Sequence, residues 1–320
     1  MSRQRTHPRG SFLAILLAGM WPVSAALGLE PHKNIGQYAH NTWTAEDGLP
    51  GEAVYQILQS PDGYLWLRTS AGLVRFDGVR FVLVDPVVGK EPLSEPVKAI
   101  CRGADGDLII RTTSRTVIRR NGVFSDYLPP SPLPDGEIKT LFESREHELF
   151  VGSDDFIYLL GRGGPRLLQA GTGWVDSFLE DPAGVIWIGG SSNLFRYSGG
   201  KLTPFPKNLF SLGADSLAED LDQTLWVGTR DGPYRIDRGR SRFEAAARGS
   251  IRNEVHTILE DRAGNLWSGT ESQGLFRIAD NRVSSFGSAD GLTDNRVLSL
   301  FEDREGSLWV GTSSGLDRFR

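Results

Sequence analysis

Five side chains in this sequence are the best candidates for binding chemistry. Arg68, Arg111 and Arg115 could together hold a carboxylate or a sulfate, because each guanidinium offers paired N–H donors that match such groups. Trp174 could stack on the face of a sugar ring, and His256 is the histidine best placed for acid–base chemistry. We take these five as the candidate ligand-binding residues.

Each candidate also has a plainer interpretation. The arginines can pair with nearby acids such as Asp105, or point to solvent, and we favour this reading. Trp174 can pack against a neighbouring unit, which we also favour because tryptophan is mostly buried. His256 has only Glu254 nearby, and one histidine without a fixed partner is a weak case for acid–base catalysis. We therefore expect that the protein is not an enzyme.

Composition narrows the classes of function further. The chain has 320 residues, a net charge of −5 and 39% hydrophobic residues, which is typical of a globular protein without a nucleic-acid-binding face. The one cysteine, Cys101, excludes an internal disulfide and a cysteine-built metal site. No Asp-x-Asp-x-Asp loop or close histidine pair occurs, so we expect no metal and no cofactor.

The elements that must position these residues come from an internal repeat. An apolar run, an acidic turn and an aromatic or large apolar position recur at spacings of 43, 41, 37, 39, 41 and 42 residues. This recurring position, which we call the slot, is occupied by Trp66, Ile109, Phe150, Trp187, Trp226, Trp267 and Trp309. Glycine usually stands three residues before the slot, where a tight turn needs it, and two residues after it, where another backbone can approach. Arg68 and Arg111 replace this second glycine.

A repeat of about 40 residues with four short strands is typical of a β-propeller blade. In one unit we expect strands over 255–261, 265–270, 275–279 and 282–287. Seven slots predict an all-β, seven-bladed propeller in which 297–319 provides only three strands. We expect the N-terminal strand, 35–44, to complete this last blade and close the ring, which removes open sheet edges.

The N-terminus has the pattern of a secretory signal. Arg3, Arg5 and Arg9 precede a short apolar run and a small-residue site ending at Ala26. We therefore expect a signal peptide at 1–26, a linker at 27–34 and the propeller at 35–320. The apolar run is shorter than the roughly 20 residues that span a bilayer. The mature chain is expected to be periplasmic and without a transmembrane span.

The pattern Gly-Asn-Leu-Trp-x-Gly-Thr, followed by Gly-Leu-Phe-Arg and preceded by Asp-Gly-Leu, resembles the two-component regulator propeller family. In that family the propeller is the periplasmic sensor region of hybrid histidine kinases and diguanylate cyclases. The match is sharpest at 40–81 and 175–320, and no kinase phosphate loop or Gly-Gly-Asp-Glu-Phe motif occurs in this sequence.

The resemblance implies an exported, non-catalytic ligand-binding or sensor propeller. Its partner would be a small molecule or an oligosaccharide, or a periplasmic signalling protein, with a carbohydrate as the ligand that the family suggests. Two alternatives stay open. The chain could be a protein-interaction scaffold or a truncated receptor fragment, or it could be a propeller lyase of the streptogramin type that uses His256.

Overall fold

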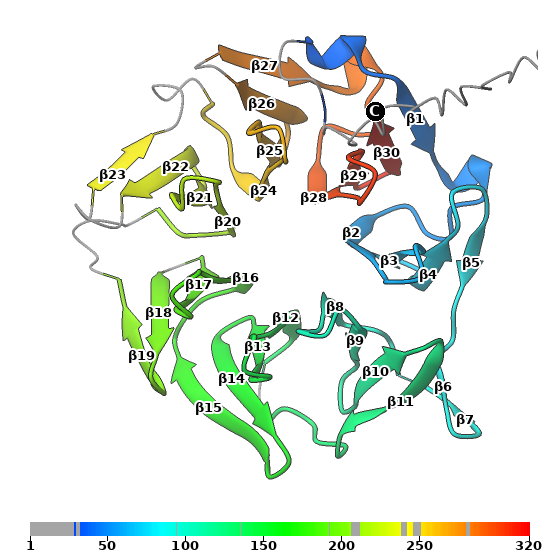
Figure 1. Cartoon of the computed structure of the whole chain (residues 1–320), viewed down its shortest axis with the longest axis vertical. Coiled ribbons are helices and arrows are strands. Elements are labelled where there is room, and N and C mark those ends of the chain that lie inside the picture. The colour runs from blue at the N-terminus through cyan, green and yellow to red at the C-terminus, as the bar shows by residue number, and fades with distance from the viewer. Residues whose placement is uncertain are drawn as a thin grey trace, which may run out of the picture.

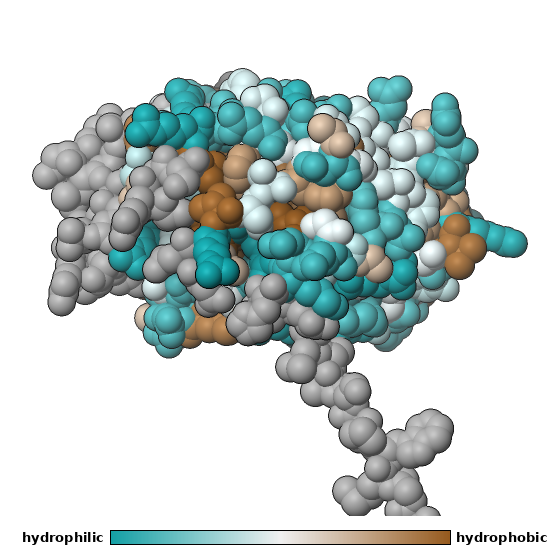
Figure 2. Space-filling model, turned by 90° about the horizontal axis from the view of Figure 1, so that it is seen from above, coloured by the Kyte–Doolittle hydropathy of each residue, from teal (hydrophilic) through white to brown (hydrophobic). Residues whose placement is uncertain are grey.

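The computed structural model describes residue 29 and residues 33–93, 95–134, 136–191, 193–205, 212–237, 242–245, 251–279 and 282–320. The signal peptide expected at 1–26 lies outside these residues. Seven four-stranded antiparallel sheets surround a central opening, each with its first strand innermost (Figure 1). The predicted seven-bladed propeller is therefore confirmed. Seen edge-on, the molecule is a thick disc whose drawn side is mostly hydrophilic (Figure 2).

The first four blades follow the chain in order. Blade 1 contains β2 (Val54–Gln59), β3 (Leu65–Thr69), β4 (Gly72–Phe76) and β5 (Phe81–Leu83). Blade 2 contains β8 (Ala99–Arg102), β9 (Leu108–Arg111), β10 (Thr116–Arg120) and β11 (Val123–Leu128). Blade 3 contains β12 (Ile138–Glu143), β13 (Leu149–Ser153), β14 (Phe156–Gly161) and β15 (Gly164–Ala170). Blade 4 contains β16 (Val175–Glu180), β17 (Ile186–Gly190), β18 (Leu194–Ser198) and β19 (Lys201–Pro204).

The last three blades include the closure. Blade 5 contains β20 (Ser216–Glu219), β21 (Leu225–Thr229), β22 (Gly232–Asp237) and β23 (Arg242–Ala245). Blade 6 contains β24 (Val255–Glu260), β25 (Leu266–Thr270), β26 (Leu275–Ala279) and β27 (Arg282–Phe286). Blade 7 contains β28 (Val297–Glu302), β29 (Leu308–Thr312), β30 (Leu316–Phe319) and β1 (His40–Trp43). The small elements are η1 (Ile35–Gln37), η2 (Ala45–Asp47), η4 (Ser288–Asp290) and the hairpin β6 (Val87–Val88) with β7 (Glu91–Pro92).

The turn before the slot explains why the repeat forms the same hairpin each time. The residue three before the slot has positive φ at the glycines of five blades, such as Gly306 (φ 81°), and also at His147 (φ 62°) and Gln223 (φ 63°). At the four later tryptophan slots, the indole N–H donates to the turn aspartate, as Trp309 Nε1 does to Asp303 Oδ2 at 2.7 Å. The turn and the tryptophan therefore fix each other.

The glycine two residues after the slot allows adjacent blades to touch. A Cβ on Gly189 would lie 2.4 Å from the Ala214 carbonyl oxygen of the next blade, and one on Gly311 would lie 2.5 Å from that of Val54. Such contacts would force the blades apart, so the expectation of close backbone approach is confirmed. Ser299 Oγ adds a 3.0 Å hydrogen bond to the Val54 carbonyl across the junction of blades 7 and 1.

Closure of the ring joins the two ends of the described chain. β1 pairs antiparallel with β30, in register from His40 opposite Phe319 to Trp43 opposite Leu316. The strand is shorter than the expected 35–44, because residues Ile35–Gln37 form the 3₁₀-helix η1 instead. Inside the blade, buried Asp317 receives His40 Nε2 at 2.8 Å and also the Thr293 hydroxyl.

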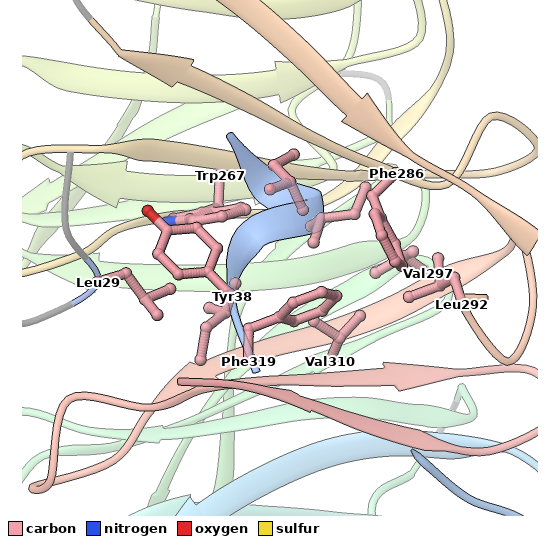
Figure 3. Close-up of a cluster of buried hydrophobic side chains, with 11 residues drawn as sticks. Leu29, Tyr38, Trp267, Phe286, Leu292, Val297, Val310 and Phe319 are labelled. Carbon is pink, nitrogen blue, oxygen red and sulfur yellow. The ribbon is translucent and has the colours of Figure 1, made fainter. Parts of the chain in front are cut away.

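The segment before β1 packs on blade 6. Leu29 is 3% exposed and Tyr38 is 6% exposed, and both join a cluster with Trp267 and Phe319 (Figure 3). Arg277, itself buried, donates to Asn265 Oδ1 at 3.0 Å and 2.8 Å and to the Lys33 carbonyl. Leu29 and the Lys33 carbonyl, both within the expected linker, are therefore bound to blade 6.

Candidate functional site: the axial pocket

A pocket of about 730 Å³ opens on the propeller axis where the inner strands begin. All seven blades contribute to its wall. The size falls in the range of about 300–1,000 Å³ that is usual for small-molecule sites. The central opening of Figure 1 marks the axis that this pocket follows.

One repeat position supplies the inner wall. In five blades the inner strand carries a β-bulge at its second residue, as between Val54 and Gln56 on β2, where Tyr55 has no partner across the ladder. A bulge re-aims a side chain, here towards the axis. The equivalent residues of all seven blades stand eleven positions before the slot, and all of them line the pocket: Tyr55, Lys98, Lys139, Asp176, Asp215, His256 and Leu298. We call this set the inner ring.

A second repeat position supplies the rim. The residue thirteen positions before the slot lines the pocket in five blades: Pro96, Glu137, Trp174, Glu254 and Arg296. Arg68 on β3 adds to the wall, as do Ser191 and Arg230 in the loops between the second and third strands of blades 4 and 5. Of this wall, sequence reasoning selected Arg68, Trp174 and His256 as candidate ligand-binding residues. The missed residues were detectable as repeat positions where residue type varies while the slot and its glycines recur.

Charges are segregated around the pocket. Lys98 and Lys139 follow each other on blades 2 and 3, whereas Asp176 and Asp215 follow each other on blades 4 and 5. Glu137 partly neutralises the lysines, at 3.0 Å from Lys139 Nζ and 3.8 Å from Lys98 Nζ. The acidic side has no matching cation within ion-pair distance among the described residues.

Asp215 is the most perturbed acid of this wall. Its side chain is 7% exposed, and its Oδ2 atom is buried with no hydrogen-bond partner in the described structure. Burial, and then repulsion from Asp176 and Glu254, raises the pKa of Asp215 to about 7, against the pull of Arg230 and His256. A buried carboxyl in this state favours either a proton or an incoming cation.

Arg68 is the counterpart on blade 1. Its Nε donates to Gln56 Oε1 at 3.1 Å, and its guanidinium lies 4.4 Å from the centre of the Tyr55 ring. Gln56 Oε1 also accepts the Ile100 N–H at 3.0 Å and so joins blades 1 and 2. No carboxylate in the described residues pairs with Arg68, and desolvation lowers its pKa to about 10.

The structure does not bring the three arginines together. Arg111 is fully buried, where it donates to Thr116 Oγ1 at 2.8 Å and to the Ser131 carbonyl at 2.7 Å. Arg115 forms a bidentate pair with Asp126 on the outer strands, at 2.8 Å and 3.0 Å from its Nη2. The predicted convergence of the arginines is therefore wrong, since Arg68 faces the pocket, Arg111 is buried inside blade 2 and Arg115 pairs with Asp126.

Trp174 does not have the packing role that we favoured. Its side chain is 60% exposed at the rim, and its ring faces Lys139, whose Nζ lies 5.4 Å from the ring centre. A ring exposed to this extent is a surface on which a ligand can stack. The tryptophan remains available because it precedes β16 at the mouth of the pocket rather than between two sheets.

His256 lines the pocket, but its ring is engaged. His256 Nε2 contacts Glu271 Oε2, and the same carboxylate oxygen lies 2.9 Å from Arg296 Nε. Glu254, the partner considered from sequence, lines the pocket beside it without a hydrogen bond to the ring among the described contacts. The described residues hold no cluster of three or more His, Cys, Asp or Glu side chains suited to a metal ion.

Fold and site together define this chain as a seven-bladed β-propeller with a polar axial pocket. The two component regulator propeller family matches it at residues 48–71, 249–272 and 291–314. Each match spans an inner strand and the strand after it. These three repeats are therefore two-component regulator propeller repeats, which confirms the resemblance. No curated protein matches the chain by sequence.

Solved structures share the fold. One is the extracellular domain of BT4673 from B. thetaiotaomicron, which is described as part of a one component or hybrid two component system. It is 20% identical to this chain with a TM-score of 0.71, and the match covers 90% of this chain and 40% of that one. The chain thus spans about two fifths of that ectodomain. A streptogramin B lyase is 15% identical with a TM-score of 0.71, over 90% of this chain and 99% of the lyase. An inactive histidine-to-alanine virginiamycin B lyase from Staphylococcus aureus, solved with quinupristin, is 13% identical with a TM-score of 0.70, over 88% of this chain and 99% of the lyase.

Among the described residues, no helix is long and apolar enough to span a membrane.

Proposed function

We propose that this protein is a non-catalytic sensor propeller that binds a small ligand in its axial pocket. The observation that carries the proposal is the inner ring. Positions needed only for folding, such as the slot, keep a large apolar side chain in every blade, whereas the seven equivalent positions around the pocket carry aromatic, basic, acidic and apolar side chains. Such variety in a repeated frame is what recognition of an asymmetric ligand requires.

Two further observations favour a ligand over a broad protein interface. Trp174 is largely exposed at the rim of the pocket. On the side of the disc drawn in Figure 2, hydrophobic residues occur as small patches between hydrophilic ones, whereas a scaffold surface would present a broad apolar patch. A carbohydrate stacked on Trp174 is the ligand that the two-component family suggests.

Absence of catalysis is part of the proposal. His256 Nε2 contacts Glu271, which also binds Arg296, so the imidazole is held in a local hydrogen-bond network. A general base needs a ring nitrogen within hydrogen-bond reach of a substrate proton, and the Glu271 contact occupies Nε2 of His256. If a bound compound were converted to product, and a His256→Ala variant abolished the conversion, the lyase interpretation would replace this proposal.

The decisive experiment is a ligand screen by thermal shift on purified residues 27–320. Glycans and small metabolites are tested against the unchanged protein, Trp174→Ala and the control Leu221→Ala, which truncates an exposed side chain in the turn before β21. A ligand at a hundred times its Kd stabilises by about 2.7 kcal/mol, so the Tm should rise by several degrees. The rise should persist in Leu221→Ala and fall in Trp174→Ala. Equal shifts in both variants would contradict the pocket, and no hit of any class would support a scaffold.

Export is the remaining part. The N-terminal pattern at 1–26 and the extracellular origin of the BT4673 domain support a periplasmic location. Expression of the full chain in a Gram-negative host should yield a periplasmic product beginning after Ala26, read by intact mass. A cytoplasmic product that keeps residues 1–26 would contradict the proposal.

A further inference from the structure

Only some of the charged groups in the pocket wall have ion-pair partners, and the others are the charges that a ligand would meet. Lys98 and Lys139 pair with Glu137, and Arg296 pairs with Glu271. The charged groups that line the pocket without an ion-pair partner in the described residues are Arg68, Asp176, Asp215, Arg230 and Glu254. A ligand that enters the pocket therefore meets free charges of both signs.

The three free acids stand side by side. Asp176, Asp215 and Glu254 belong to blades 4, 5 and 6, and Asp215 feels the charge of both neighbours. Asp215 is also more than nine-tenths buried with Oδ2 unpartnered, although it lines the pocket. An unpartnered buried carboxylate is costly unless a cation reaches it. Arg230 acts on Asp215 electrostatically, but it makes no ion pair with Asp215 among the described contacts.

Arg68 stands across the axis from Asp215. Blades 1 and 5 lie on opposite sides of the opening, where Figure 1 shows β2 and β20 facing each other. Arg68 uses Nε on Gln56 and its flat face on Tyr55, and no described acceptor binds its Nη groups. Two free, coplanar Nη donors fit a carboxylate.

Resting on the proposed ligand-binding function, we propose that the axial pocket recognises a zwitterionic ligand, a short peptide with free ends. Its ammonium group binds Asp215 between Asp176 and Glu254, and its carboxylate binds Arg68. The body of the peptide crosses the axis between the aromatic rings of Tyr55 and Trp174. A pocket of about 730 Å³ suits a ligand of drug size, larger than a single amino acid.

The test uses isothermal titration calorimetry on residues 27–320 with the tripeptide Ala-Tyr-Ala in four forms: free, N-acetylated, C-amidated and blocked at both ends. The free form should bind, and either block should weaken binding about tenfold or more, as loss of one charge-assisted contact implies. In Asp215→Asn, N-acetylation should cease to matter, while C-amidation still does. In Arg68→Gln, the reverse is expected. The comparison of peptide forms on the unchanged protein needs no variant to fold.

The outcomes separate this inference from the proposed function. If the doubly blocked peptide binds as tightly as the free one, the charged ends are irrelevant and the inference fails. If no peptide binds but a neutral oligosaccharide does so in a Trp174-dependent manner, the inference fails while the sensor function stands. If no ligand of any class binds, both fail together.

Discussion

Replacing Asp215 with asparagine should stabilise the protein at neutral and alkaline pH. The carboxyl is 7% exposed, and burial with repulsion from Asp176 and Glu254 raises its pKa from 3.8 to about 7. Because the pKa of Asp215 is higher in the folded state than in the unfolded state, its ionisation lowers the free energy of unfolding. This destabilisation is absent below the unfolded pKa of 3.8, grows as the pH rises, and is complete above the folded pKa near 7.

The magnitude follows from the two pKa values. A difference of about three units corresponds to roughly 4 kcal/mol at about pH 8, and to about 1 kcal/mol at about pH 4.5. Asparagine has nearly the same shape but cannot ionise, so Asp215→Asn should gain these amounts in its free energy of unfolding. Both the destabilisation by ionised Asp215 and the stabilisation by asparagine concern the unliganded protein. A bound cation would make the ionised aspartate more favourable than asparagine.

Urea denaturation followed by tryptophan fluorescence measures the difference between variant and unchanged protein at each pH. Effects of other titrating groups cancel in that difference when they act equally on both proteins. Glu46→Gln, at an exposed position of η2, removes the same charge and should leave the pH profile unchanged. If Asp215→Asn were less stable at about pH 8, or its gain did not vary with pH, Asp215 would be ionised and well paired, and the electrostatic account of the pocket would be refuted.

Three further predictions test the propeller fold. Arg111→Met should lower the free energy of unfolding by about 3 kcal/mol, because it leaves buried acceptors unpaired. Arg115→Ala, which removes a partly exposed surface ion pair, should lower it by at most about 1 kcal/mol. Equal losses in urea denaturation would contradict these different roles. Gln223→Gly should gain about 1 kcal/mol by relieving a left-handed backbone, while Asp222→Gly next to it should lose stability; a thermal melt compares the two. Deletion of residues 27–45 should abolish cooperative unfolding, because it removes β1 and its pairing with β30, and a deletion variant that melts like the intact chain would argue against ring closure.

The architecture of the propeller was readable from sequence because it is a set of local requirements repeated at a fixed period. Each requirement restricts the residue type at one position of the repeat. The turn needs positive φ, the slot needs a large apolar side chain, and the position two residues after the slot needs a glycine where the adjacent blade approaches. Even His147 and Gln223, which break the glycine rule, adopt the same backbone. The shared Asp-Gly-Leu motif before β2 and β28 likewise identified the strand that closes the ring, although η1 replaced its first residues.

The pocket was decided by tertiary structure. In five blades a bulge turns one side chain towards the axis, and residues about 40 positions apart meet only when the ring closes. Arg68 and Arg111 occupy the same repeat position, yet one faces the pocket and the other is sealed inside blade 2 by Thr116 and Ser131. Sequence by itself determined the blades and their number, because those depend on neighbours along the chain. Which side chains face the axis, and which charges stay unpaired there, depends on contacts between blades and so required the closed ring.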